Sequence, residues 1–290
     1  MELRGIYPAL VSPFNPDLSF NYGALREVVR ETKKRGVHGF YVGGSTAETF
    51  SLSLDEREKA LETVLDAAGD SPVIAHVGTL NPMDLKRLAS HAARAGAAAV
   101  SSVPPFYFKH GEEEIDAYYQ DLVAASEGLK VILYNIPVFT GVTLNKKNCA
   151  KLFTAGGVAG IKHTSHNLYD LERLKSAFPE AIMLSGHDEV FCPAQLMGAE
   201  GCIGSTLNIM PRRFAEMDAL IKAGKYDEAM KVQRRVNDVI DAMQQFNFFG
   251  ALKYILELQG FPVGDTRRPL LPLSDENKKM VGELYRKYLV

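Results

Sequence analysis

The 290-residue sequence lacks several features that would each indicate a particular class of protein. It has no marked excess of charge, because 33 basic residues stand against 35 acidic ones and the formal net charge is −2. Its few cysteines, Cys149, Cys192 and Cys202, include no C-x-x-C pair. No stretch reaches the roughly 18 unbroken apolar residues of a membrane span. We therefore expect no nucleic-acid-binding surface, no structural zinc site, no disulfide framework and no membrane partner.

We also expect no secretory signal at the beginning of the sequence, MELRGIYPALVSPF. Pro8 and Pro13 interrupt the apolar stretch that follows Arg4, and no small-residue cleavage site is present. Hydrophobic residues nevertheless make up 46% of the chain, enough to bury a large core. We expect a soluble, cytoplasmic protein whose cysteines are free thiols in that core.

Short apolar runs fill the first two-thirds of the chain, each followed by a break rich in Gly, Ser, Pro or Thr and then by a helical pattern. The runs span residues 5–14, 39–45, 73–78, 97–105, 130–137, 158–165, 181–189 and 201–210. Their nearly continuous apolar character is typical of strands buried on both faces of a parallel sheet. Eight strand–helix units predict an α/β fold, a single (β/α)8 TIM barrel, with an open doubly wound sheet as the alternative.

Beyond the eighth run the pattern is purely helical. Amphipathic segments span residues 212–224, 226–246, 251–260 and 275–290. This is more helix than the last unit of a barrel needs, and no Pro/Gly/Ser linker sets it apart. We expect residues 1–225 to form the barrel and residues 226–290 to form a C-terminal helical extension packed on it, within one structural domain.

In a parallel barrel the chemistry lies at the C-terminal ends of the strands, and Lys162 occupies such a position in GIKHTS (160–165). A lysine in an apolar strand loses hydration, which favours the free amine and allows it to attack a ketone. A lysine that reaches solvent or pairs with an acid is the other interpretation. Tyr134 ends the preceding strand, where it could relay protons beside Lys162 or simply fill the barrel interior.

Two more strand ends carry polar groups. GGSTAE (43–48) could hold a carboxylate through main-chain N–H groups and the hydroxyls of Ser45 and Thr46; it is not followed by the G-K-[ST] of a P-loop. SGHDE (185–189) places two acids beside a histidine. We favour hydrogen bonds to a polyol over a metal there, because no second histidine stands at ligand spacing and His163 and His166 lie on another turn.

Taken in order, GGSTAE, YNIP (134–137), GIKHTS, GHDE (186–189) and GSTLN (204–208) resemble the dihydrodipicolinate synthase / N-acetylneuraminate lyase family. The resemblance extends over nearly the whole chain. It implies a class I aldolase that needs no metal and no cofactor beyond a Schiff base on Lys162. It also implies a homotetramer.

The resemblance assigns roles to individual residues. Lys162 matches the Schiff-base lysine and Tyr134 the proton-relay tyrosine, while Ser45 and Thr46 match the pair that holds the carboxylate of the 2-oxo acid. Tyr107 matches a tyrosine directed towards a neighbouring subunit's site. The remaining substrate-binding positions are those matching Thr164, Gly186, Asp188, Glu189, Ser205 and Phe249.

The same comparison favours one branch of the family. The synthase branch carries an arginine two positions after the proline of its YN-x-P motif, and here that position is Phe139, which cannot form a bidentate pair with a carboxylate. GHDE and GSTLN resemble the sialic acid lyase branch. We therefore expect cleavage of N-acetylneuraminate to pyruvate and N-acetylmannosamine, with a role in sialic acid catabolism.

Two departures from the family pattern lie near the expected site. Ala47 stands where glycine is usual, which would cost strain if that position needs a positive φ, and Leu207 stands where lyases commonly have tyrosine. The alternatives are an aldolase for 2-keto-3-deoxy sugar acids, dihydrodipicolinate synthase, which Phe139 disfavours, and a sugar-acid-binding barrel without turnover.

Overall fold

The computed structural model describes residues 3–290. Over these residues, parallel strands in the order β1-β8-β7-β6-β5-β4-β3-β2 form the centre of the molecule. An isolated parallel bridge between Ala9 and Tyr41 joins the two ends of this series, so the sheet closes on itself. The strands are β1 (Gly5–Pro8), β2 (Phe40–Val42), β3 (Val73–His76), β4 (Ala99–Ser102), β5 (Lys130–Asn135), β6 (Val158–His163), β7 (Ile182–Ser185) and β8 (Gly201–Gly204). The predicted TIM barrel is confirmed, and the open sheet is excluded.

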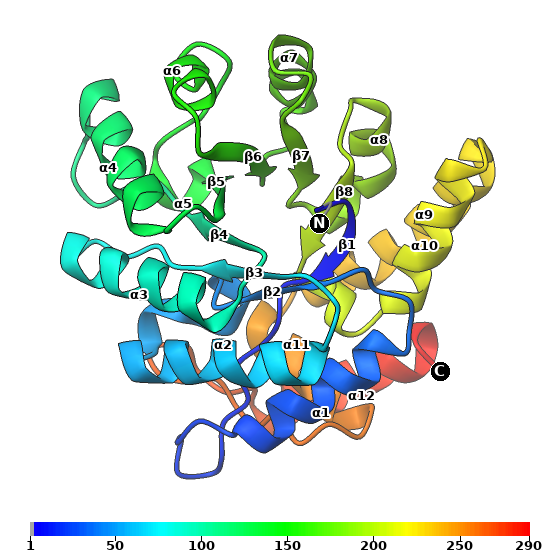
Figure 1. Ribbon diagram of the computed structural model, residues 1–290. Coiled ribbons are helices and arrows are strands. Elements are labelled where there is room, and N and C mark those ends of the chain that lie inside the picture. Colours follow the sequence, from blue (N-terminus) through cyan, green and yellow to red (C-terminus); the bar gives the residue numbers. More distant parts are fainter. Residues whose placement is uncertain (1–2) are drawn as a thin grey trace.

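Helices surround the strands (Figure 1). The barrel helices are α1 (Tyr22–Lys33), α2 (Leu54–Ala68), α3 (Pro82–Ala95), α4 (Glu112–Ala125), α5 (Pro137–Thr140), α6 (Ala150–Thr154), α7 (Leu168–Ala177), α8 (Phe191–Leu196) and α9 (Pro211–Lys222). The C-terminal helices are α10 (Tyr226–Met243), α11 (Phe248–Leu258) and α12 (Asp275–Tyr288). Short 3-10 turns follow three strands: η1 (Ser45–Ala47) and η2 (Thr49–Ser51) after β2, η3 (Asp188–Val190) after β7, and η4 (Thr206–Asn208) after β8.

Local sequence explains where several helices begin. Ser53 and Glu56 form a capping box at the start of α2, in which each side chain satisfies an N–H group of the other residue. Asn81 accepts from the N–H of Met83 and is followed by Pro82, which suits the first turn of α3. These caps fix the direction in which the chain leaves each strand end.

The core has two layers, because the strands bury side chains on both faces. Tyr7, Tyr41, Ile74, Ile132 and Ile203 belong to a buried cluster inside the barrel. The alternate strand residues join a larger cluster between the barrel and its helices. This arrangement accounts for the nearly continuous apolar runs and confirms that the strands are buried on both sides.

The structure differs from the sequence-based boundaries in three places. The strands are shorter than the apolar runs, because the runs continue into the turns that cover the C-terminal end of the barrel. The helical pattern at 145–153 becomes helix only at Ala150, since Asn145 first forms a turn with Asn148. The short helix α5, which begins at the last residue of YNIP, is not predicted by the sequence pattern.

Helices α10–α12 occupy the segment expected to extend the barrel. Helix α10 packs against α9, α8 and η3, while α11 packs against α12. In Figure 1, α11 and α12, orange to red, lie on the side of the barrel that also carries α1. Among the described residues, no helix is long and apolar enough to cross a membrane.

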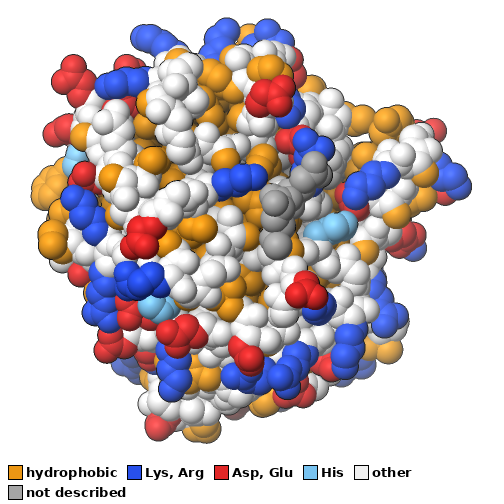
Figure 2. Space-filling view, viewed as in Figure 1, with side chains coloured by type: hydrophobic (Ala, Val, Ile, Leu, Met, Phe, Trp, Pro, Cys, Tyr) orange, Lys and Arg blue, Asp and Glu red, His pale blue; other side chains and the backbone are white. Residues whose placement is uncertain are grey.

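The charges are distributed as the near-neutral composition predicts. On the face shown in Figure 2, basic and acidic side chains are interspersed and do not gather by sign. The three cysteines are free and buried, as expected.

Candidate active site

A cavity of about 220 Å³ opens at the C-terminal end of the strands. Its lining joins residues from the ends of β2, β5, β6, β7 and β8 with residues from α10 and α11. The sequence-predicted residues that line it are Ser45, Thr46, Tyr134, Lys162, Thr164, Gly186, Asp188, Glu189, Ser205 and Phe249. Side chains that are far apart in the sequence thus face one volume.

Lys162 lies at the base of this cavity, with only 4% of its surface exposed. Its ammonium nitrogen stands 4.0 Å from the ring centre of Tyr134 and 4.4 Å from that of Tyr41. No carboxylate of residues 3–290 lies within ion-pair distance of it. The lysine therefore neither reaches solvent nor pairs with an acid, and two aromatic faces hold it in place.

Tyr134 is the direct strand neighbour of Lys162, because β5 and β6 pair these two residues in register. Its hydroxyl is 3.5 Å from that of Ser45, longer than an ordinary hydrogen bond but in position to close on a ligand. The ring of His76 packs edge-on against Tyr134 at 5.9 Å. Burial lowers the pKa of His76 well below its usual value, so this neighbour is a neutral imidazole.

The turn after β2 brings two hydroxyls to the cavity. Ser45 and Thr46 begin η1, and the first N–H groups of such a turn have no partner within it. Thr46 Oγ1 lies 2.7 Å from Ser205 Oγ, so the turn after β2 contacts the turn after β8. A ligand that reaches one of these hydroxyls also meets the other.

The strained backbone conformation in this turn lies at Glu48 and not at Ala47. Ala47 lies within η1 and does not have a positive φ, whereas Glu48 adopts the left-handed conformation with φ 55° and ψ 41°. A non-glycine residue in this region costs about 1–2 kcal/mol. Position 47 therefore does not need a positive φ, and alanine fits there without strain.

Buried charges hold Glu48 in this conformation. Its Oε1 lies 2.7 Å from the ammonium of Lys253 on α11, and both side chains are almost fully buried. Its Oε2 accepts from the main-chain N–H of Arg267 at 2.7 Å. Helix α11 thereby anchors the turn that carries Ser45 and Thr46, a contact that no local sequence pattern predicts.

Asp188 is a buried carboxylate with one oxygen left free. Its Oδ2 accepts from the N–H and the hydroxyl of Thr206, each at 2.7 Å, while Oδ1 has no hydrogen-bond partner. Burial raises the pKa of this carboxyl to about 6, against the lowering effect of the Thr206 hydrogen bonds. The side chain lies directly over Gly204, where an added Cβ would come within 1.5 Å of Oδ1.

The side chain of Thr164 packs against Gly186 as that of Asp188 packs against Gly204. A Cβ at position 186 would come within 1.8 Å of Thr164 Oγ1, so only glycine allows the close approach. The Thr164 hydroxyl is buried and has no hydrogen-bond partner. Thr164 Oγ1 and Asp188 Oδ1 are thus two buried polar atoms of lining residues that lack a partner.

Glu189 carries a second carboxylate at the rim of the cavity. Its Oε1 lies 2.9 Å from His166 Nε2 and 3.0 Å from His187 Nδ1. Burial alone would raise the pKa of this carboxyl, but the hydrogen bond and charge of His187 and the contact with His166 lower it to about 2. The two neighbouring acids therefore differ: Glu189 is ionised throughout the physiological range, while Asp188 titrates near its lower end.

Some residues that line the cavity are not predicted from the sequence, and one predicted site residue, Tyr107, does not line it. The additional lining residues include Ile136, Val138, His187, Ile240, Gln244 and Phe248. Those on α10 lie far along the chain and carry no motif, so only the fold identifies them. Tyr107 is 84% exposed, has φ 80° and does not line the cavity of its own chain. Leu207 is fully buried and does not line it either.

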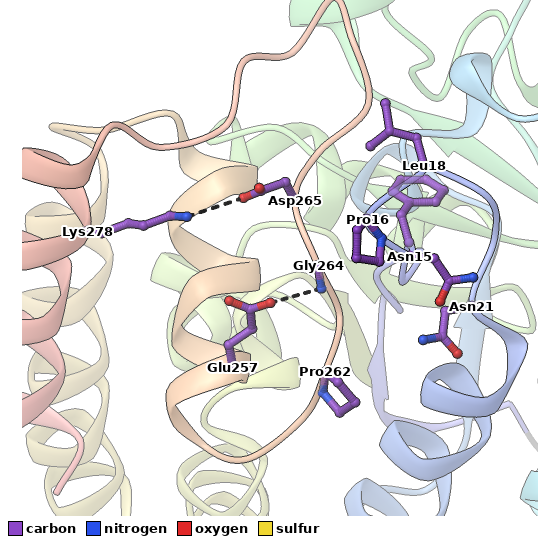
Figure 3. Close-up of a pocket in the computed structure, with 10 residues that line it drawn as sticks. Asn15, Pro16, Leu18, Asn21, Glu257, Pro262, Gly264, Asp265 and Lys278 are labelled. Atoms are coloured by element: carbon purple, nitrogen blue, oxygen red, sulfur yellow. Dashed lines mark hydrogen bonds and ion pairs between the residues drawn. The ribbon is translucent and has the colours of Figure 1, made fainter.

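A second hollow of about 360 Å³ lies between the 14–21 loop and the segment 257–265. In Figure 3 the N–H of Gly264 donates to Glu257, and Lys278 faces Asp265. These charged groups satisfy one another, and the lining holds neither a buried amine nor an unpaired buried acid. The first cavity is the one equipped for chemistry.

Known proteins resemble the chain over its full length. A sequence profile of the Dihydrodipicolinate synthetase family matches residues 2–287. The N-acetylneuraminate lyase of Fusobacterium nucleatum is 37% identical over 289 residues, 99% of each chain. The structure of CdNal from Clostridium difficile in complex with mannosamine has a TM-score of 0.96 at 35% identity and covers 100% of both chains. A Ruminococcus gnavus sialic acid aldolase, solved as a catalytic lysine mutant, has a TM-score of 0.93 at 32% identity over 99% of this chain and 98% of that one.

Proposed function

The chain belongs to the dihydrodipicolinate synthetase family, and from this premise we propose that it is a class I aldolase that cleaves N-acetylneuraminate to pyruvate and N-acetylmannosamine. It is a lyase of the carbon–carbon type. The observation that carries the assignment within this chain is the buried amine of Lys162, which has no acid partner and lies beside Tyr134. An amine that binds no acid and is screened from water is suited to attack a ketone.

The reaction begins when Lys162 Nζ adds to the C2 ketone of the open-chain sugar acid. Water leaves and a protonated imine forms, which can accept an electron pair. Ser45 and Thr46 hold the substrate carboxylate at the turn after β2. The 2.7 Å contact between Thr46 and Ser205 supports this role, because it fixes the Thr46 hydroxyl at the cavity wall.

Bond cleavage then depends on Tyr134. Tyr134 donates its phenolic proton to the hydroxyl that leaves C2 as water, and the resulting phenolate then takes the proton of the C4 hydroxyl. The C3–C4 bond breaks, and the electron pair moves towards the imine to leave an enamine on Lys162. N-acetylmannosamine departs as the aldehyde. Protonation of the enamine at C3 and addition of water at C2 release pyruvate and the free amine. The in-register pairing of Tyr134 with Lys162 supports this division of labour, since both groups face the same reacting carbons.

The polar wall opposite explains the choice of a hydroxyl-rich substrate. Asp188 Oδ1 and Thr164 Oγ1 lack partners, and Glu189 and Ser205 lie nearby on the lining. Carboxylates accept hydrogen bonds from vicinal hydroxyls. No arginine lines the cavity within residues 3–290, and Phe139 stands at its edge, 64% exposed. A second substrate carboxylate would therefore find no bidentate partner, which disfavours the synthase reaction.

We also propose a homotetramer in which Tyr107 reaches the site of a neighbouring subunit. Tyr107, Phe108 and Phe50 are 84%, 71% and 60% exposed. Phe50 and Phe106 lie 5.1 Å apart, and Tyr107 packs edge-on against Phe108 at 5.0 Å. These four aromatic residues, the aromatic patch, supply the apolar surface that an interface between subunits needs.

A product assay tests the reaction. The protein is incubated with N-acetylneuraminate, and pyruvate and N-acetylmannosamine are quantified beside a Lys162→Ala control. We expect equal amounts of the two products and none above background from Lys162→Ala. Turnover of a 2-keto-3-deoxy sugar acid in place of N-acetylneuraminate would support the assignment as an aldolase and change the proposed substrate. Absence of turnover with both would contradict the proposed function.

A further inference from the structure

The turns after β6 and β7 bring three metal-ligating side chains together at the rim of the cavity. His166 Nε2, His187 Nδ1 and a carboxylate oxygen of Glu189 all lie within 4.8 Å of one another. The two imidazole rings stack at 4.1 Å with an angle of 15° between them. Both ring nitrogens are directed at the same oxygen, Glu189 Oε1.

We propose that His166, His187 and Glu189 form a binding site for Zn²⁺. The three ligands are the His₂Glu set found in zinc sites that keep a fourth position for water or substrate. Metal–ligand bonds of about 2.0–2.2 Å place the ligand atoms of a tetrahedral site about 3.3 Å apart, close to the spacing seen here. Coordination requires the two imidazole rings to rotate out of their stacked arrangement, so that the plane of each ring contains the ion.

The types of ligand in the cluster indicate which ion it binds. The negative charge of the carboxylate between the two imidazoles disfavours the binding of an anion such as phosphate. Magnesium and calcium prefer oxygen ligands, whereas imidazole nitrogen suits zinc, copper and nickel. A divalent transition metal is therefore the ion that matches all three groups.

Strand pairing holds the cluster together. The N–H of Gly186, on the turn that carries His187, donates to the carbonyl of His163 at 2.8 Å, which joins the turns after β6 and β7. Asn237 on α10 donates to the main-chain carbonyl of Glu189 at 3.0 Å. The His166 side chain is 66% exposed, so an ion can enter from solvent.

The other histidines offer no comparable site. His163 is buried with both ring nitrogens in hydrogen bonds, and His76 is buried with Nδ1 on the carbonyl of Gly43. His91 pairs with a single acid, Glu62, at 3.0 Å. Within residues 3–290 the three-residue cluster of His166, His187 and Glu189 is the one that brings three such ligand atoms together.

Occupancy has a consequence that rests on the proposed function. Glu189 would leave the sugar's hydroxyls to coordinate zinc, so the ion would raise KM for the sugar acid. Lys162 and Tyr134 would be untouched, so Schiff-base formation with pyruvate would continue. Zinc would act on recognition of the sugar tail and not on the covalent step.

Zinc binding is measured first, without substrate, on chelator-treated full-length protein. We expect calorimetry with ZnCl₂ to give one ion per chain, and Co²⁺ to give the visible absorption of a tetrahedral site. His166→Gln should weaken zinc binding by more than about 100-fold, since losing a ligand exceeds the 10–100-fold effect of losing an outer-shell group. His91→Gln, which removes a partly buried histidine with one acid partner, should bind zinc like the parent protein.

Equal zinc affinity in His166→Gln and the parent would overturn the site, as would the absence of a stoichiometric ion. This result does not depend on turnover, so it is distinct from a failure of the aldolase. In a protein that cleaves N-acetylneuraminate, zinc should raise KM in the parent and not in His166→Gln, with unchanged borohydride trapping of pyruvate. Inhibition of equal size in both proteins would contradict the role of Glu189.

Discussion

At the scale of single residues, the buried carboxyl of Asp188 predicts that substrate binding depends on pH. Burial raises the pKa of its carboxyl to about 6, while that of Glu189 is about 2. As the pH falls through 6, Asp188 takes up a proton and its free oxygen ceases to be a purely accepting group. Glu189 keeps its charge over the same range.

We therefore expect KM for N-acetylneuraminate to rise as the pH falls from 7 to 5, by about tenfold, the usual worth of a hydrogen bond to a charged group. Steady-state kinetics across this range measure it. Asp188→Asn mimics the protonated form, so its KM should be high at pH 7 and should lack this rise. A variant that keeps the parent's pH dependence would show that another group titrates.

Tyr134 is tested by removing one hydroxyl. Tyr134→Phe keeps the ring that faces Lys162 and loses the proton relay, so kcat should fall by about 10²–10⁴-fold. Imine formation should be affected less than cleavage, which a comparison of pyruvate trapping with N-acetylneuraminate turnover would reveal. If turnover and trapping both stay near the parent values, Tyr134 has no role as a relay.

At the scale of elements, the turn after β2 depends on a helix far away in the sequence. Glu48 adopts a left-handed conformation just after Ser45 and Thr46 and is held by Lys253 on α11. The same helix places Phe249 on the cavity lining. The C-terminal extension thus contributes to the geometry of the site as well as covering it.

Removing one partner of this pair should destabilise the protein. Lys253→Met leaves the Glu48 carboxylate buried and unpaired, which costs about 3–5 kcal/mol of unfolding free energy. Urea unfolding monitored by circular dichroism measures it. The double variant Glu48→Gln, Lys253→Met should recover part of the loss. If the single variant unfolds at the parent's urea concentration, the pair does not hold the turn.

Elements also show what sequence patterns can and cannot predict. Strand ends were predictable, because apolar runs stop at polar motifs, and this placed Lys162, Ser45 and Asp188 on one edge of the barrel. Contacts between different turns could not be predicted from the sequence. No sequence pattern pairs His166 with Glu189, because the two residues lie on different turns, yet neighbouring strands bring these turns together. Ile240 on α10 and Gln244 just past its end line the cavity, and no local pattern marks them.

At the scale of the whole molecule, the barrel and its extension form one scaffold with an aromatic patch on its surface. The proposed tetramer predicts a mass in solution of four 31.9 kDa chains. Phe108→Asp would place an unpaired charge in the interface, which costs several kcal/mol, so smaller species should appear. Size-exclusion chromatography with light scattering measures this, and Tyr226→Asp, at an exposed aromatic on α10, is the matched control.

The value of kcat should depend on whether the subunits assemble. If Tyr107 reaches a neighbouring site, the smaller species of Phe108→Asp should have a lower kcat than the parent. A parent protein that runs as a single chain, or a Phe108→Asp variant that keeps both the parent's mass and its kcat, would contradict the proposed interface. The Tyr226→Asp variant should match the parent in both measurements.

The most direct test of the central claim is to trap the covalent intermediate. The protein is incubated with N-acetylneuraminate, reduced with borohydride and mapped by mass spectrometry. The account predicts a pyruvate-sized adduct on Lys162 and none in Lys162→Ala. An adduct on a different lysine, or no adduct from either N-acetylneuraminate or pyruvate, would contradict it.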